Sequence, residues 1–420
     1  MLFVKCEVLF VKCEVSMKKV VFALFLTSLV LFSCSGESVE VDSVNQQTIL
    51  VYMPWSGSES HSGLYPNFKQ NLDSIEAAIK NRKGLGKTRA LIFISESANT
   101  SKLYEIRYEE NTCKRELLKT YTGRDYTTAE GIANILTDTK NAAEALNYAL
   151  IVGCHGTGWT YVSDWQDYPN SAKSHALRVK RNRPSDDRFE RTRFFGSVDD
   201  NRFATDIETL ADGIRKSGLH LQFILFDDCY MANVEVAYEL RNVTNFLIAS
   251  TSEIMAIGMP YADMWKSLNV QAPNYKSAVE AFHSFYSNYR SPYGTIAAID
   301  CRQMDNLAAV MKQINEHYAL DESLFEEIQV LDGFDDPIFF DMGDYVAKLC
   351  TDQYLYEKFT AQMAKTVVNK ANTPQIYSYL YWSPRTIDVN TFSGITISDP
   401  SRHIVAQRGK ERTSWWKATH

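Results

Sequence analysis

Short apolar runs alternate with amphipathic segments from Thr48 onward. Five runs are typical of buried strands: TILVYM (48–53), RALIFIS (89–95), YALIVGCH (148–155), LQFILFDDC (221–229) and NFLIAS (245–250). Between these strands, apolar residues recur with a helical period in 68–82, 127–147, 206–218 and 233–242. This alternation indicates crossover units, so we expect an α/β fold with a mostly parallel sheet covered on both faces. In such sheets, chemistry gathers at the carboxyl ends of the strands.

The pattern also suggests how the chain is divided. We expect a first α/β domain over 48–270 and a C-terminal α/β subdomain over 271–420, where a helix (275–289) and strands (293–300, 393–398) resume. Residues 160–205 interrupt the alternation. Eight basic side chains fall between Lys173 and Arg193, and no amphipathic period runs through them. This composition predicts an exposed loop without regular structure.

The N-terminal region has the features of a targeting segment. Residues 1–16 repeat LFVKCEV and precede a better start at Met17, so we interpret them as a start-site extension. Residues 17–34 combine two lysines with a short apolar run and end in LFSC, which resembles a bacterial lipobox with Cys34 as the lipidated residue. The polar stretch 35–47 then acts as a tether. We expect a lipid-anchored protein of the cell envelope or an extracellular one; an ordinary cleaved signal is the alternative.

Composition narrows the function. A net charge of -7 over 420 residues argues against a nucleic-acid binder. The eight cysteines are widely spaced without a CxxC pair, which argues against a structural zinc site and a disulfide scaffold. No dinucleotide fingerprint, P-loop, HExxH or acidic loop with calcium-ligand spacing is present. We therefore expect no metal or cofactor, and a monomer.

Two predicted strands end in reactive side chains, His155 and Cys229. Both would emerge at the same edge of a parallel sheet, where an imidazole can activate a thiol as a nucleophile. The N-terminus of the following helix would favour the thiolate by a further ~0.5–1 kcal/mol. The backbone amides of Gly156 and Cys229 could form an oxyanion hole, because a glycine amide approaches a substrate carbonyl closely.

The two blocks YALIVGCHGTGW and LQFILFDDCYMANVEVAYEL resemble the catalytic blocks of the clostripain family of cysteine peptidases (family C11). This family shares a clan with caspases, gingipains and legumains. Its pattern is an apolar strand ending in His-Gly and a second ending in Asp-x-Cys, and the resemblance spans roughly 48–416. It implies a caspase-like α/β/α sandwich with a Cys229–His155 dyad, in which His155 protonates the leaving amine and Cys229 forms the acyl-enzyme.

The resemblance also implies cleavage of protein or peptide substrates after basic residues, most often arginine. The family's acidic S1 residue two positions before the nucleophile corresponds to Asp227, with Asp228 as a competitor and a purely structural aspartate as the alternative. Glu253 and Tyr261 fit the family's S1-wall loop, which the stretch 250–261 follows only loosely. Cys154 stands before the histidine, where many relatives carry aspartate.

Family members often process themselves between the two blocks. Such a cut would fall in 173–193, and the candidate P1 residues are Lys180, Arg181 and Arg188. A solvated basic loop without processing is the alternative. Two further functions stay open: a non-catalytic, surface-anchored binding lipoprotein on the same fold, and another cysteine-dependent acyl hydrolase.

Overall fold

The computed structural model describes residues 44–166, 197, 200–380 and 385–420. Asn45–His420 forms one compact unit. The predicted signal segment with Cys34 and the basic stretch 173–193 lie outside the described residues. Among the helices that the structure describes, none is long and apolar enough to span a bilayer.

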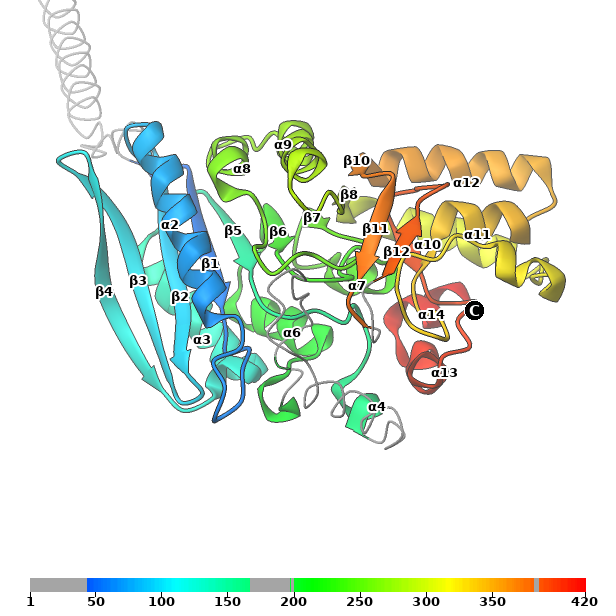
Figure 1. Cartoon of the computed structure of the whole chain (residues 1–420), viewed down its shortest axis with the longest axis horizontal. Coiled ribbons are helices and arrows are strands. Elements are labelled where there is room, and N and C mark those ends of the chain that lie inside the picture. The colour runs from blue at the N-terminus through cyan, green and yellow to red at the C-terminus, as the bar shows by residue number, and fades with distance from the viewer. Residues whose placement is uncertain (1–43, 167–196, 198–199, 381–384) are drawn as a thin grey trace, which may run out of the picture. The chain divides into compact units, whose positions relative to one another are not determined.

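A nine-stranded mixed sheet runs through this unit in the order β10-β8-β7-β6-β5-β1-β2-β3-β4 (Figure 1). Its centre is parallel and consists of β2 (Thr88–Ser97), β1 (Gln47–Met53), β5 (Asn147–Val152), β6 (Phe223–Phe226) and β7 (Phe246–Ala249). The outer strands are antiparallel: β3 (Thr100–Glu109), β4 (Thr112–Thr122), β8 (Thr295–Asp300) and β10 (Val367–Asn372). The predicted α/β fold with a mostly parallel sheet is confirmed.

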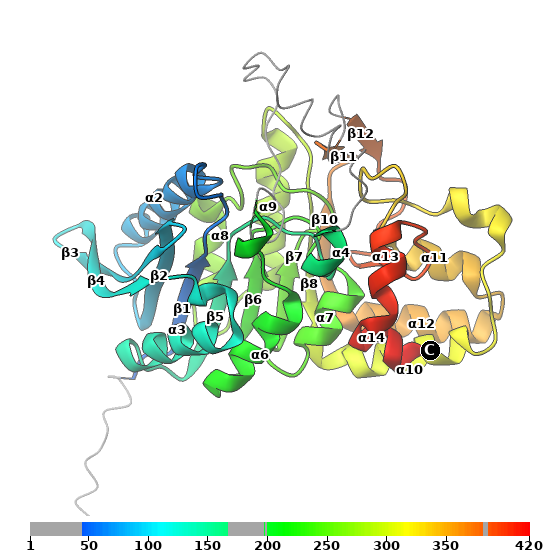
Figure 2. The ribbon, with the colours of Figure 1, turned by 90° about the horizontal axis from the view of Figure 1, so that it is seen from below.

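The parallel strands are buried because helices cover both faces of the sheet (Figure 2). On one face lie α2 (Tyr65–Asn81), α8 (Tyr261–Leu268) and α9 (Tyr275–Asn288). On the other face lie α3 (Ala129–Ala142), α6 (Ile207–Ser217), α7 (Val234–Leu240), α10 (Met304–Asn315) and α14 (Ser414–Thr419). Every residue of β1 and β6 is buried, which explains why their sequences are apolar runs without a polar alternation.

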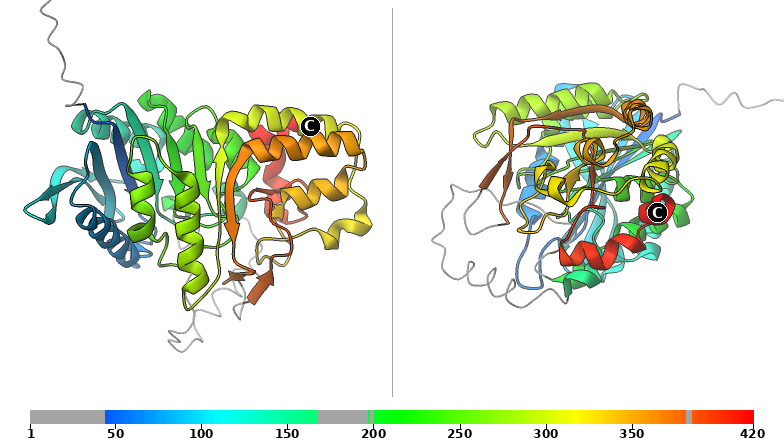
Figure 3. Two further views of the ribbon diagram at one scale, coloured as in Figure 1. Left: turned by 90° about the horizontal axis from the view of Figure 1, so that it is seen from above. Right: turned by 90° about the vertical axis from the view of Figure 1, so that its right-hand side faces the viewer.

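Strands β8 and β10 come from the region beyond residue 270 and extend the same sheet. The remaining C-terminal helices are α11 (Met342–Leu349), α12 (Gln353–Thr366) and α13 (Ile404–Gly409), and α12 runs beside α10 (Figure 3). Two small two-stranded antiparallel sheets complete the region: β9 (Phe340–Asp341) with β13 (Thr396–Ile397), and β11 (Gln375–Ser378) with β12 (Arg385–Asp388).

Several elements were not among those that the sequence predicted. The β3–β4 hairpin is one, although its turn carries left-handed backbone at Glu110 and Asn111 (φ 51° and 63°). Helix α4 (Val162–Gln166) and a 3₁₀ turn at Asn201–Phe203 lie inside the stretch 160–205 that was expected to be irregular. Tertiary packing, rather than a strong local period, fixes these short pieces.

Candidate active site

Strands β5 and β6 are hydrogen-bonded neighbours, with Val152 opposite Phe226. His155 and Cys229 each follow the end of their strand by three residues, so the register brings both to the same sheet edge. Both are buried: His155 is 9 % exposed and Cys229 is 0 % exposed. This is the edge at which parallel sheets carry their chemistry.

The two strand ends are tied together by Asp228. Its Oδ1 accepts a hydrogen bond from the Cys154 backbone N–H (2.5 Å), and its Oδ2 lies 3.4 Å from the Cys154 thiol. Asp228 precedes Cys229, and Cys154 precedes His155. The interaction therefore joins the residues immediately before the two predicted catalytic side chains, and it gives the cysteine at position 154 a definite partner.

Gly156 brings the loop of His155 directly against the segment of Cys229, the predicted nucleophile. A Cβ atom at this position would lie 2.3 Å from the Cys229 carbonyl oxygen and 3.0 Å from the Cys229 nitrogen. No side chain fits at such distances, so the backbone needs glycine here. The two amides that the sequence assigned to an oxyanion hole thus belong to segments in van der Waals contact.

The thiol of Cys229 faces the loop that follows β7. The backbone N–H of Ile254 donates to Sγ at 3.3 Å, and the Ile254 carbonyl oxygen lies 3.9 Å from the same sulfur. A backbone N–H aimed at sulfur stabilises the thiolate, which is the form that attacks a carbonyl.

Asp227 and Asp228 point to different parts of the molecule. Asp227 is fully buried, and its two carboxylate oxygens accept hydrogen bonds from the Met259 N–H and the Tyr261 hydroxyl, both at 2.9 Å. The loop 254–260 is also bound to α9, because the Tyr286 hydroxyl of that helix donates a hydrogen bond to the Gly258 carbonyl at 2.6 Å. The predicted S1 residues Asp227 and Tyr261 are therefore brought together, whereas Asp228 faces β5.

Glu253, the other predicted S1 carboxylate, lies in a network that the sequence did not reveal. It is 4 % exposed, and its Oε1 accepts from the Tyr230 hydroxyl (2.7 Å) and the Ser378 hydroxyl (2.6 Å). The Tyr379 N–H donates to Oε2 at 3.0 Å. Ser378 is 125 residues away in sequence, so no local pattern signals this contact.

Asp332 lies close to this network. Its carboxylate accepts from the backbone N–H groups of Phe334, Ile338 and Phe339 at 2.6–2.9 Å. Burial raises the pKa of Asp332 to about 7, with the backbone donors lowering it and the nearby Glu253 charge raising it further. Two buried carboxyl groups, those of Glu253 and Asp332, therefore lie close to the turn that follows Cys229.

A second cluster of carboxyl groups lies at the start of α7, the helix that follows Cys229. Asn233 caps this helix by accepting from the Val236 N–H (2.9 Å), and Glu235 in its first turn accepts from the Ser398 N–H (2.8 Å). Burial and the proximity of Asp399 raise the pKa of Glu235 to about 8. Burial raises the pKa of Asp399 to about 7, while the Lys410 ammonium acts in the opposite direction.

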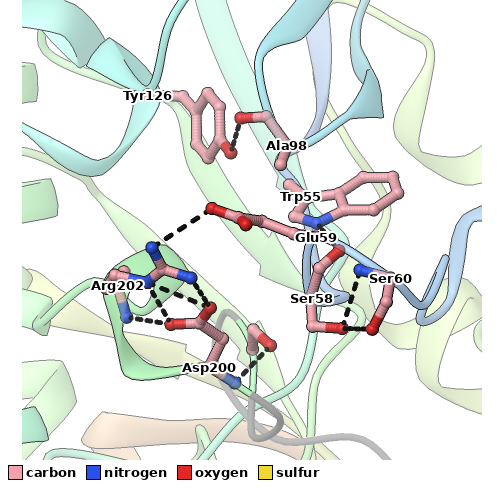
Figure 4. Close-up of polar contacts among 9 residues, drawn as sticks. Trp55, Ser58, Glu59, Ser60, Ala98, Tyr126, Asp200 and Arg202 are labelled. Carbon is pink, nitrogen blue, oxygen red and sulfur yellow. Dashed lines mark hydrogen bonds and ion pairs between the residues drawn. The ribbon is translucent and has the colours of Figure 1, made fainter.

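The loop after β1 occupies the next position along the same sheet edge, because β1 pairs with β5. Figure 4 shows Arg202 between Asp200 and Glu59, with an Arg202–Glu59 ion pair of 3.1 Å. In the same loop the Trp55 ring N–H donates to the Ser58 carbonyl at 3.1 Å. The exposed Arg202–Glu59 pair links this loop to the segment 200–202, whereas the Trp55–Ser58 bond lies within the loop.

The remaining predicted site residues, Cys34, Lys180, Arg181 and Arg188, lie outside the described residues. Within the described ranges, no group of three or more histidine, cysteine, aspartate or glutamate side chains is arranged to hold a metal ion.

Comparison with known proteins identifies the relatives of this architecture. The sequence profile of the clostripain family (Peptidase_C11) matches residues 184–380. A secreted C11 cysteine protease from Bacteroides thetaiotaomicron, "iotapain", is 43 % identical, with a TM-score of 0.79 over 90 % of this chain and 99 % of its own. No curated protein sequence matches the chain significantly.

Two further solved structures are similar. A clostripain from Bacteroides thetaiotaomicron, in complex with the peptide inhibitor BTN-VLTK-AOMK, is 50 % identical, with a TM-score of 0.52 over 54 % of this chain and 99 % of its own. An inactive zymogen C11 protease from Parabacteroides distasonis is 26 % identical, with a TM-score of 0.70 over 90 % of this chain and 99 % of its own.

Proposed function

Because this chain belongs to the clostripain family of cysteine proteases, we propose that it hydrolyses peptide bonds after arginine or lysine through a Cys229–His155 dyad. The observation that carries the proposal is the contact between the segments that follow the parallel strands β5 and β6. Asp228 binds the Cys154 N–H, and Gly156 lies against the Cys229 backbone. These contacts hold the histidine and cysteine segments together at the carboxyl edge of the sheet.

In the proposed reaction, His155 takes the thiol proton and the Cys229 thiolate attacks the scissile carbonyl. The carbonyl oxygen gains negative charge, which the Gly156 and Cys229 amides stabilise as an oxyanion hole. His155 then gives its proton to the leaving amine, and the C–N bond breaks to leave a thioester. Water attacks the thioester with His155 accepting its proton, and the release of the acid product restores the thiolate.

Specificity for basic residues is assigned to Asp227. Its carboxylate is oriented by Met259 and Tyr261 in the loop that contacts the nucleophile, and a carboxylate binds a guanidinium or ammonium through charge-assisted hydrogen bonds. The clostripain that is 50 % identical was crystallised with an inhibitor whose peptide, VLTK, ends in lysine. A lysine-ended inhibitor of a close relative supports a basic P1 residue here.

Fluorogenic peptides with arginine, lysine or aspartate at P1 test the proposal. We expect turnover of the arginine and lysine peptides and a loss of at least ~1000-fold in Cys229→Ala and His155→Ala. Asp227→Asn should lower the preference for basic over neutral P1 residues by roughly 10- to 100-fold. Absence of turnover, together with absence of labelling by a lysine-ended thiol-directed inhibitor, would instead indicate a binding lipoprotein.

The proposal includes self-processing in 173–193, with Lys180, Arg181 or Arg188 as the P1 residue. One relative is described as a zymogen, which supports processing in the family. Purified protein should become nicked in this stretch on incubation, and Cys229→Ala should stay intact. A wild-type chain that remains whole after long incubation, while cleaving added peptides, would rule out this part alone.

We also propose that Cys34 anchors the enzyme to the membrane of the cell envelope through a lipid. Cys34→Ser should then move the protein from the membrane fraction to the soluble fraction without changing peptide cleavage. An equal distribution of the two proteins between fractions would favour an ordinary cleaved signal.

A further inference from the structure

Tyr230, the residue after the nucleophile, has a left-handed backbone with φ of 60°. This conformation costs an L-residue about 1–2 kcal/mol relative to the right-handed region. A bulky side chain adopts it only where the surroundings over-determine the position. The contacts of Tyr230 therefore indicate what fixes the backbone at Cys229.

Four contacts hold Tyr230. Its ring stacks on Phe339, with centroids 4.9 Å apart and planes 12° apart. Its hydroxyl donates to Glu253 Oε1 at 2.7 Å. Its N–H donates to the Ser252 carbonyl at 3.1 Å, and its own carbonyl accepts from the Asn233 side chain at 2.6 Å. The ring, the hydroxyl and the backbone are each anchored, so the strained conformation is maintained.

Glu253 connects both sides of the nucleophile. Through its carboxylate it binds Tyr230, which follows Cys229 in the chain. Through its backbone it adjoins Ile254, whose N–H donates to Cys229 Sγ at 3.3 Å. The carboxylate is fixed in turn by the Ser378 hydroxyl and the Tyr379 N–H. One buried side chain thus joins the turn that carries the amide of Cys229 to the loop that contacts its sulfur.

We propose that Glu253 is a positioning residue, which orients the Cys229 amide and thiol through Tyr230 and Ile254, and is not part of the S1 pocket. The inference rests on the proposed peptidase function. Glu253 differs from Asp227 in what its carboxylate binds: Glu253 binds the residue that follows Cys229, whereas Asp227 binds Met259 and Tyr261 in the segment after β7. Its role is to hold a geometry for catalysis whatever the substrate side chain.

The two roles predict different kinetics. An S1 carboxylate binds the P1 side chain, so its loss raises KM for basic substrates and changes the ratio of basic to neutral turnover. A positioning residue acts on the attacking atom and on the oxyanion amide. Its loss lowers kcat for every P1 residue by a similar factor.

The test compares Glu253→Gln and Tyr230→Phe with Asp227→Asn as the matched S1 variant. Each is assayed on peptides with arginine, lysine and a neutral residue at P1. We expect both positioning variants to lower kcat about 10- to 100-fold on all peptides, with KM within about threefold of the wild type. Asp227→Asn should change the basic-to-neutral ratio instead.

Two additional readouts separate positioning from a general loss of structure. The kcat of the double variant Glu253→Gln/Tyr230→Phe should lie within about threefold of the kcat of the more impaired single variant, because both changes act on the same Tyr230–Glu253 contact. The pH dependence of kcat/KM should also shift in both single variants, since the Ile254 N–H that stabilises the thiolate is displaced. Ser378→Ala, which removes one donor only, provides a milder variant if Glu253→Gln does not fold.

A Glu253→Gln protein that changes the P1 preference, or one that keeps the wild-type kcat, would overturn the inference. A wild-type protein that cleaves none of the peptides would overturn the proposed function instead. The inference is then decided by the alkylation rate of Cys229 with iodoacetamide, followed by mass spectrometry. That rate should fall several-fold in Tyr230→Phe, with Cys113 on β4 as the internal control, and an unchanged rate would refute the inference.

Discussion

Two buried glutamates near Cys229 differ in the hydrogen-bond donors that the protein offers to their carboxylates. Glu253 and Glu235 are 4 % and 3 % exposed; Glu253 lies near the buried Asp332, and Glu235 lies near the half-buried Asp399. Glu253 accepts from two hydroxyl groups and a backbone N–H. Glu235 accepts from the Ser398 N–H, but among the described residues its Oε2 has no hydrogen-bond donor.

The aspartate beside each glutamate shows a similar contrast. Asp332 accepts from three backbone N–H groups, whereas Asp399 Oδ2 has no donor within the described part of the chain. The Lys410 ammonium donates these hydrogen bonds to the backbone carbonyls of Asp399 and Ser401, not to the carboxylates of Asp399 or Glu235. The comparison teaches that dense donors fix the position of a buried carboxylate, whereas burial raises the pKa of Asp332 and Asp399 alike, to about 7 in each.

The largest expected effect comes from removing the Glu253 carboxylate, with removal of the Glu235 carboxylate as its comparison. Glu253→Ala leaves two hydroxyl groups and a backbone N–H buried without their acceptor, and should lower the free energy of unfolding by about 3–5 kcal/mol. Glu235→Ala removes the acceptor of the Ser398 donors, and about 1–2 kcal/mol is expected. Urea unfolding at pH 7 measures both losses. Equal losses would remove the distinction between the two sites.

The next effect is a pH dependence carried by Glu235. The folded protein keeps the Glu235 proton up to about pH 8, whereas the unfolded chain releases it near pH 4.5. The folded state therefore binds more protons between these limits, so this group's stabilisation is complete below pH 4.5 and is lost as the pH rises through about 8. Asp399, with a pKa of about 7, adds to the same trend.

Glu235→Gln removes this titration and keeps an acceptor for the Ser398 N–H. The free energy of unfolding of the wild type, minus that of the variant, should fall by on the order of 3 kcal/mol between pH 5 and pH 8. Denaturant unfolding at several pH values measures it. A difference that does not change with pH would show that Glu235 does not hold the proton.

The smallest expected effect concerns the hydrogen bonds around Glu253. Ser378→Ala deletes one of the hydroxyl donors to Glu253 and should cost about 1 kcal/mol, because the Tyr230 hydroxyl and the Tyr379 N–H remain. Leu117→Thr on the exposed strand β4 is the surface control, for which a change within about 0.5 kcal/mol is expected. Similar values for the two variants would mean that the Ser378 bond adds no stability.

The central sheet was predictable because full burial leaves a strong local signature. Runs such as ILVYM and FILF are apolar throughout, and β1 and β6 are buried along their whole length. The β3–β4 hairpin was not predicted, since β4 is exposed from Arg115 to Thr120 and carries charged residues there. The alternation in KLYEIRY and the turn at Glu110–Asn111 are the local signals that could have identified it.

The candidate site likewise has a part that the sequence could predict and a part that it could not. His155, Gly156 and Cys229 follow strand ends, and the register of β5 with β6 explains why a sequence pattern could pair them. The contacts of Asp228 with Cys154, and of Glu253 with Ser378, join residues 74 and 125 positions apart. Neither contact has a periodic or compositional signature, so only the folded chain reveals them.

The segment that follows Cys229, including α7, receives two hydrogen bonds from residues that are synthesised much later. Ser398, whose N–H binds Glu235, lies 163 positions further along, and the Thr396 N–H donates to the Ala232 carbonyl at 3.0 Å. While the chain is being synthesised, the segment around Cys229 therefore lacks these bonds until residues 396–398 have been made. A chain that ends before Thr396 cannot complete the hydrogen bonds of this segment.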